Sequence, residues 1–153
     1  MAMAGAQHVF TAVCLKSLLS ADSSLFSLID IVEHIGFVHA NGDRDEKDDQ
    51  LVVHMEILST WTRADFATPG TCLSRLDVVA PNQEILRKWE HPIDLSQLMW
   101  ERVRYVIDDL PLREFGRHEV RVYQRDTEDQ GWGVAVAVYP ILMRMHEPAM
   151  APS

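Results

Sequence analysis

The segment that decides the fold is residues 100–123, WERVRYVIDDLPLREFGRHEVRVY. Both of its halves alternate apolar with charged residues, a period of two that is typical of a β-strand with one face in a core and one in solvent. In the first half the apolar face is Val103, Tyr105 and Ile107, and the charged face is Arg102 and Arg104. In the second half Val120 and Val122 face one way, and Glu119 and Arg121 the other.

A short connection with turn chemistry joins the two halves. Pro111 lacks the N–H that a strand ladder needs, and Gly116 permits backbone angles that a β-carbon would resist. We therefore predict that residues 100–123 form a β-hairpin, whose apolar face is part of the core and whose charged face is in solvent.

Similar segments recur along the chain, at residues 8–15, 51–61, 71–79, 84–89 and 132–142. Small residues alternate with branched ones in the last segment, which favours a strand packed on both faces. Pro140 indicates that the far end of this strand lies at a sheet edge. Residues 94–97 are able to start a helical turn.

Residues 25–37, LFSLIDIVEHIGF, fit two structures. A helical stripe with Gly36 as its cap would contain Leu25, Leu28, Ile29, Val32 and Ile35. A single strand would instead have one face made of Leu25, Ile29, Ile31, Ile35 and Phe37. The β-branched content favours the strand, although periodicity alone leaves the helix open.

Short strands that recur every dozen or so residues, with turns between them, predict an all-β fold. We expect a two-sheet antiparallel β-sandwich of immunoglobulin-like topology, with at most one or two short helical segments. The single domain is predicted to span residues 7–143, with a disordered N-terminus at residues 1–6 and a disordered tail at residues 144–153.

Two stretches of the chain carry a resemblance to a known family. They are LLSADSSLFSLIDIVEHI at residues 18–35, and Leu110-Pro-Leu leading through Gly116 into His118-Glu-Val-Arg-Val. Together they resemble an uncharacterised bacterial family of small immunoglobulin-like β-sandwich domains. The chain departs from the family pattern at His118, where an aromatic residue, commonly Tyr, is expected. The family has no established activity, so the resemblance implies a fold and no mechanism.

The 153 residues are enough to bury a core without disulfides. Cys14 and Cys72 lie in apolar or alternating contexts and are predicted to be reduced core thiols, which indicates a cytoplasmic protein. The apolar run at residues 6–21 is interrupted by Lys16 and has no basic residue before it, so we expect a strand there rather than a signal peptide or a membrane span.

The formal net charge is −9 at pH 7. Binding to nucleic acid or to an anionic membrane surface depends on positive charge, so both kinds of partner are disfavoured. Neutral or basic proteins, and a second copy of the chain, remain as expected partners.

No sequence motif indicates catalysis or a cofactor. The chain lacks a Gly-rich phosphate loop, a nucleophile elbow, paired zinc cysteines and an HExxH helix. An acid–base group could be assembled from Asp30, Asp108, Asp109 and His118, but carboxylates beside a loop are more often turn-stabilising acceptors. We predict no catalytic, cofactor-binding or metal-binding residues.

Two groups of residues are possible metal sites, and each also has a simpler interpretation. His54 and Glu56 lie two residues apart on one predicted strand face, and further ligands would have to come from His8, His34, His39 or His91. The loop at residues 41–50 clusters Asp43, Asp45, Asp48 and Asp49, which are hard oxygen donors suited to calcium, but it also holds Arg44 and Lys47. In both places a solvated polar surface is the favoured interpretation.

Two groups of residues are candidates for a protein interface. The first is an arginine stripe on the outer face of the predicted hairpin, Arg102, Arg104, Arg117 and Arg121, which would suit an acidic peptide or phosphate. Glu101 and Glu119 lie among these arginines, so charge pairing explains the stripe equally. The second is the tryptophans near loops, Trp89, Trp100 and Trp132, whereas Trp61 is expected in the core.

The leading functional hypothesis is a non-catalytic β-sandwich that binds a protein partner or self-associates. The alternative is a small enzyme or a metal-dependent ligand-binding domain that uses histidines and carboxylates at the loop ends. A concave polar pocket with shifted titrations would favour the alternative.

Overall fold

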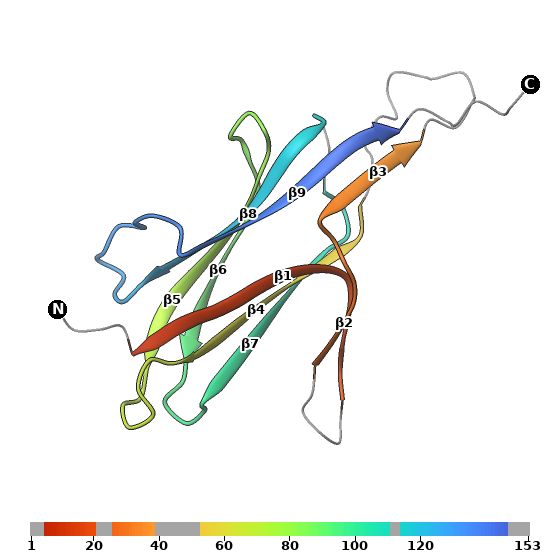
Figure 1. Cartoon of the computed structure of the whole chain (residues 1–153). Helices are drawn as coiled ribbons and strands as arrows, with labels where there is room; N and C mark the ends of the chain where they lie inside the picture. The colour runs from red at the N-terminus through yellow and green to blue at the C-terminus, as the bar shows by residue number, and fades with distance from the viewer. Residues whose placement is uncertain (1–4, 21–25, 39–52, 111–113, 147–153) are drawn as a thin grey trace, which may run out of the picture.

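The computed structural model describes residues 5–20, 26–38, 53–110 and 114–146. Within these ranges the chain forms nine strands and no helix (Figure 1). They are β1 (Ala6–Leu19), β2 (Phe26–Ile31), β3 (His34–Val38), β4 (Met55–Arg63), β5 (Thr71–Val79), β6 (Ile85–Asp94), β7 (Trp100–Ile107), β8 (Gly116–Arg125) and β9 (Ala137–His146). It follows that no helix of these residues is long and apolar enough to cross a membrane.

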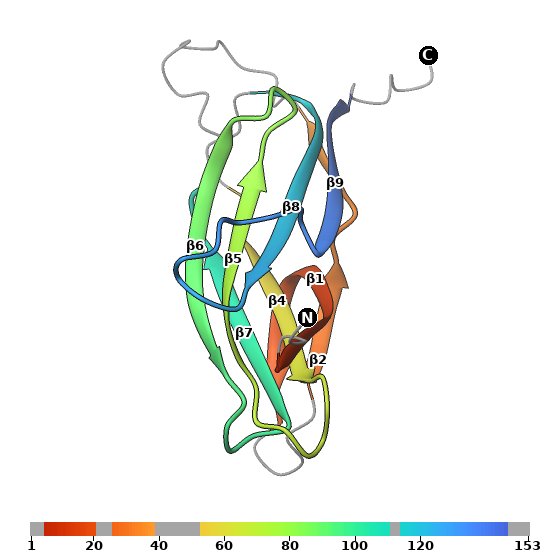
Figure 2. The same ribbon diagram turned by 90° about the vertical axis from the view of Figure 1, so that its left-hand side faces the viewer.

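The strands form two sheets that lie face to face (Figures 1 and 2). One has four strands in the order β2-β1-β4-β7, and the other has five in the order β3-β9-β8-β5-β6. Every neighbouring pair is antiparallel except β3 and β9, which are parallel. The predicted all-β, two-sheet sandwich is therefore confirmed, as a mostly antiparallel one.

The core lies between the sheets, and both inner faces supply apolar side chains to it. Val13, Ile57 and Trp61 come from the four-stranded sheet, and Leu76 and Ile141 from the other; all five are essentially inaccessible to solvent. Each such side chain contributes roughly 1.5–3 kcal/mol by its burial. The predicted burial of Trp61 is confirmed.

The predicted hairpin at residues 100–123 is wrong, although its faces are right. β7 pairs with β4, whereas β8 pairs with β5 and β9 in the other sheet. The connection between the two strands therefore crosses from one sheet to the other. The apolar faces of both strands are buried, with Val103, Tyr105 and Ile107 from β7 and Val120 and Val122 from β8. Alternation predicts which face of a strand is buried, but it does not predict which strand pairs with it.

The described part of the segment 25–37 is mainly strand, as favoured, but it forms two strands rather than one. β2 belongs to the four-stranded sheet and β3 to the five-stranded sheet. The chain crosses between them at Val32 and Glu33, where the Val32 N–H donates to the Val13 carbonyl at 2.7 Å and the Leu142 N–H donates to the Glu33 carbonyl at 2.9 Å. Each sheet thus holds one end of the crossing.

Several predicted boundaries and faces also change. β1 runs from Ala6 to Leu19, beyond the predicted residues 8–15, and β9 begins at Ala137 and continues to His146. Val138 and Pro140 are exposed, so the prediction of a last strand packed on both faces is wrong. No helical turn forms at residues 94–97, where the Ser96 N–H instead donates to the Asp94 carboxylate at 2.9 Å. The acidic loop 41–50 and both chain ends, residues 1–4 and 147–153, lie outside the described residues.

Candidate functional site

The four arginines of the predicted stripe lie on opposite outer surfaces of the sandwich. Arg102 and Arg104 alternate with the buried residues of β7, so they point outward from the four-stranded sheet. Arg117 and Arg121 point outward from the five-stranded sheet in the same way. The prediction of one continuous stripe is wrong, because it required β7 and β8 to be neighbours.

On β8 the two arginines share one acidic partner. Glu119 forms ion pairs with Arg117 at 3.1 Å and with Arg121 at 2.8 Å. Arg121 also donates to the side-chain oxygen of Gln83 at 2.6 Å. These contacts are the charge pairing that was the alternative interpretation of the stripe. Glu101 contacts β6 instead, where it accepts a hydrogen bond from the Asp94 N–H at 2.9 Å.

The three candidate tryptophans have different surroundings. Trp89 packs against the core, with its ring centroid 5.4 Å from that of Tyr105. Trp132 lies under the guanidinium of Arg125, 4.2 Å from the ring centroid. Trp100 is half-exposed and shares the outer surface of the four-stranded sheet with Arg102 and Arg104. Trp100 and Trp132 therefore lie at the surface, and Trp89 faces inward.

The histidines and carboxylates considered for a metal site are held apart. The Nδ1 atom of His54 lies within hydrogen-bond distance of the Asp108 carboxylate, at 2.6 Å, whereas Glu56 is buried and turned toward Ser17. His8 contacts Thr11 at 2.8 Å, and His91 contacts Glu101 at 3.3 Å. Within the described residues no three metal-binding side chains converge, and His39 lies outside them.

The acid–base group considered from the sequence is not assembled either. His118 is fully buried in the core, with Nδ1 3.4 Å from the Gly116 carbonyl oxygen. Asp109 forms an ion pair with Arg87 at 3.0 Å, and Asp108 is paired with His54. His118 thus has a structural setting rather than a catalytic one.

A surface that the sequence analysis missed is the ribbon formed by the end of β1 and by β2. Beyond Cys14, β1 pairs only with β2 among the described strands. Figure 1 shows β1 curving at its far end and β2 continuing away from β8 and β9. This ribbon carries five large apolar side chains that are 39–62% exposed, and we call them the hairpin patch: Leu15, Leu18, Leu19, Ile29 and Ile31.

Two buried residues, Cys14 and Glu56, separate the hairpin patch from β7 in the strand register. Ile31 lies opposite Cys14, Cys14 opposite Glu56, and Glu56 opposite Val106. Val106 is also exposed, on the strand that carries Trp100, Arg102 and Arg104. The signal in the sequence was that residues 15–19 and 26–31 have apolar residues on both faces, without the alternation of a half-buried strand.

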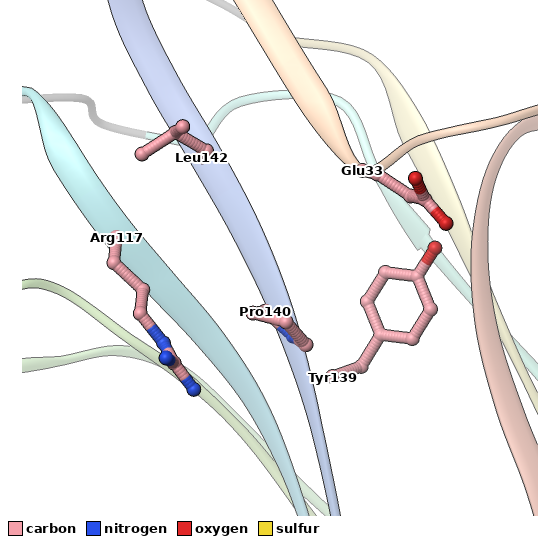
Figure 3. A pocket seen from close by; sticks show the side chains of 5 residues that line it. All are labelled: Glu33, Arg117, Tyr139, Pro140 and Leu142. Atoms are coloured by element: carbon pink, nitrogen blue, oxygen red, sulfur yellow. The ribbon is translucent and has the colours of Figure 1, made fainter.

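A second feature is a pocket of about 320 Å³ where β3 begins to pair with β9, lined by Glu33, Arg117, Tyr139, Pro140 and Leu142. Figure 3 shows the Tyr139 hydroxyl pointing toward the Glu33 carboxylate, with Arg117 on the other side of Pro140. These residues come from three parts of the chain, so no local sequence pattern brings them together, and only Arg117 is a predicted site residue.

The Tyr139 hydroxyl is an unusual group in this pocket. Its oxygen is buried, and it has no hydrogen-bond partner among the described residues. A buried polar group without a partner costs about 1–3 kcal/mol. Burial, and then the negative charge of Glu33, raise the pKa of Tyr139 above its ordinary value. The hydroxyl therefore stays neutral and is able to make a hydrogen bond.

The comparisons with known proteins give little. No family model and no curated protein matches the chain. Two solved structures of a glycosyl hydrolase family 2 member from Bacteroides cellulosilyticus, one of strain DSM 14838 and one from microfluidic crystals, match it at 12% identity with TM-scores of 0.43 and 0.42. Each match covers 57% of this chain, and the matched part makes up 12% and 11%, respectively, of those chains. The likeness is therefore to a small part of those enzymes.

Proposed function

We propose that this protein is a non-catalytic binding module that docks onto another protein through the hairpin patch. The observation that supports this is the group of five exposed apolar side chains on a ribbon of only two strands. Large apolar side chains that are exposed together on one element of a soluble domain, rather than scattered singly over its surface, commonly mark an interaction site. Its burial against a partner would contribute about 25 cal/mol for each Å² of apolar area removed from water.

Charge favours a different protein over a second copy as the occupant. The chain carries a net charge of −9, whereas the ribbon holds one cation and one anion, Lys16 and Asp30. Two copies would approach each other with the same excess of negative charge, which opposes association. A partner with an apolar centre and a neutral or basic rim meets no such repulsion.

The rival function, an enzyme or a metal-dependent ligand-binding domain, has no specific support. His54, His91 and His8 each contact a single carboxylate or hydroxyl, and no three metal-binding side chains converge among the described residues. We also propose a cytoplasmic location and membership of the uncharacterised immunoglobulin-like family described above. Two free, buried cysteines support the location, and the two-sheet sandwich supports the family.

The test begins with the whole chain as bait for cross-linking in cells, followed by identification and purification of the partner. The affinity of the purified pair is then measured by calorimetry for the wild type and for Leu18→Asp. We expect the substitution to weaken binding at least tenfold, about 1.4 kcal/mol, because it places a charge in an apolar interface. Leu18 is 44% exposed, so the variant should unfold at the same denaturant concentration as the wild type.

The matched control is Val134→Asp, which introduces the same charge at a residue that is 90% exposed and lies outside the patch. Its affinity for the partner should stay within twofold of the wild type. Equal affinities for wild type and Leu18→Asp would show that the patch is not the interface. A dimer in sedimentation that Leu18→Asp dissociates would make a second copy the occupant, contrary to the proposal.

A further inference from the structure

The pocket between β3 and β9 has one free charge. Glu33 lines it, and its carboxylate forms no ion pair or hydrogen bond with the residues that the structure describes. The guanidinium of Arg117, the other charged group of the pocket, is engaged by Glu119 at 3.1 Å and lies on the far side of Pro140 (Figure 3). The part of the pocket next to Tyr139 therefore has a negative electrostatic potential.

The remaining walls are apolar. Pro140, Leu142 and the ring of Tyr139 line the pocket, and a chain of methylene groups packs well against such surfaces. An anionic ligand would be repelled by Glu33, and a purely apolar one would leave both the carboxylate and the buried Tyr139 hydroxyl without a partner. A cation on an aliphatic stem satisfies all of these groups together.

We infer that this pocket binds the ammonium end of a lysine side chain presented by a partner protein. An ammonium has three N–H donors, which are enough for the Glu33 carboxylate and the Tyr139 hydroxyl oxygen at the same time. Glu33 is exposed, so its side chain is free to rotate and admit the donor to the hydroxyl. The net charge of −9 further attracts a cationic group to this surface.

The position of the pocket favours an ammonium group carried by a polypeptide over one carried by a free amine. β3 pairs with β9 only from Leu142 onward, so the preceding part of β9 has no described strand on that side. An extended segment laid along this edge would place alternate side chains over Pro140 and into the pocket. The inference does not depend on the hairpin patch, and the two surfaces are tested separately.

The experiment is an NMR titration of the isotope-labelled whole chain with the peptide acetyl-Thr-Val-Lys-Val-Thr-amide. The matched peptide has norleucine in place of lysine, which keeps most of the stem and removes the charge. We expect the lysine peptide to bind at least tenfold more tightly than the norleucine peptide, with the largest shifts at Glu33, Tyr139 and Leu142. The third probe, n-butylammonium, should bind at least tenfold more weakly than the lysine peptide.

Two variants test the groups that would bind the ammonium, and two more serve as controls. Glu33→Gln should weaken binding of the lysine peptide at least tenfold, and Tyr139→Phe about threefold. Glu84→Gln, at an exposed carboxylate that does not line the pocket, should leave it unchanged, and so should Leu18→Asp in the hairpin patch. Equal binding of the two peptides, or of wild type and Glu33→Gln, would overturn the inference. If n-butylammonium bound as tightly as the lysine peptide, the claim that the ligand is a polypeptide rather than a free amine would be wrong.

Discussion

Ser17 donates both its backbone N–H, at 2.8 Å, and its hydroxyl to the same carboxylate oxygen of Glu56, Oε2. Both residues are buried, and the contact joins the curved end of β1 to the centre of the four-stranded sheet. The sequence placed Glu56 on a solvated strand face. The structure instead makes it the group that fixes the base of the ribbon carrying the hairpin patch.

Replacing this carboxylate should destabilise the protein. Glu56→Gln keeps the size of the side chain but turns two charge-assisted hydrogen bonds into neutral ones, so we expect a loss of about 1.5–3 kcal/mol in the free energy of unfolding. Urea denaturation measures it. Glu90→Gln, on an exposed part of β6, is the control and should change the stability by less than about 0.5 kcal/mol. Equal effects of the two substitutions would contradict the role given to Ser17 and Glu56.

The same carboxylate should contribute to acid sensitivity. Burial acts to raise the pKa of Glu56, but the hydrogen bonds from Ser17 and the positive charge of Arg104 outweigh it, so the pKa lies below its ordinary 4.5. A lowered folded-state pKa stabilises the protein above about pH 4.5 and loses that contribution as the pH falls further. Unfolding curves recorded between pH 5 and pH 3 should therefore show a smaller loss of stability for Glu56→Gln than for the wild type.

A second pH effect, at higher pH, should come from His118. Burial lowers its pKa below the ordinary 6.5, and its Nε2 atom is buried without a hydrogen-bond partner in the described part of the chain. The unfolded state therefore binds the proton more readily, and stability should fall as the pH drops below about 6.5, by at most about 1.4 kcal/mol per pH unit for one histidine. Urea denaturation at several pH values between 5 and 7.5 measures this slope.

His118→Phe should reduce the slope, whatever its effect on stability at pH 7.5. Burial also lowers the pKa of His8, so part of the slope should remain in this variant and disappear when His8→Gln is added. A variant His118→Phe that keeps the full wild-type slope would show that His118 does not titrate differently in the folded and unfolded states.

The close approach of Gly5 and Gly70 gives a further prediction. A β-carbon built on Gly70 would lie 1.7 Å from the carbonyl oxygen of Gly5, so any side chain there must displace the backbone at the start of β1. We expect Gly70→Ala to lower the free energy of unfolding by about 1–3 kcal/mol, as overpacking does. Gly131→Ala is the control, because nothing lies within 4 Å of its β-carbon position, and its thermal midpoint should match that of the wild type. Similar midpoints for the two variants would contradict the close contact.

The two thiols should be protected from modification. Burial, together with the charges of Asp126 and Glu101, raises the pKa of Cys72 from 9.0 to about 12, so its reactive thiolate is about a thousand-fold scarcer at pH 8. Burial and the charge of Glu56 also raise the pKa of Cys14. A disulfide reagent that absorbs on reaction should label neither cysteine in the native protein and both after denaturation. Rapid labelling of the native protein would contradict the burial of these residues.

The candidate surfaces were only partly predictable. The sequence selected Trp100, Arg102 and Arg104 as interface residues, and the structure places all three on the outer surface of the four-stranded sheet, away from the hairpin patch. It did not select the patch, because exposure of an apolar residue depends on which other segments cover it. The pocket at Glu33 and Tyr139 could not be predicted from the sequence either, since the residues that line it meet only where β3 begins to pair with β9.

The sequence by itself determined the class of fold and the inward faces of the main strands. Alternation along β7 and β8 was enough to predict that Val103 and Val120 are buried, because successive side chains of a strand point to opposite faces. Only the tertiary structure decided that these two strands lie in different sheets, and that the chain also changes sheet at Val32 and Glu33. The physical reason is that backbone hydrogen bonds are the same for every strand, so the choice of partner depends on how the whole core packs.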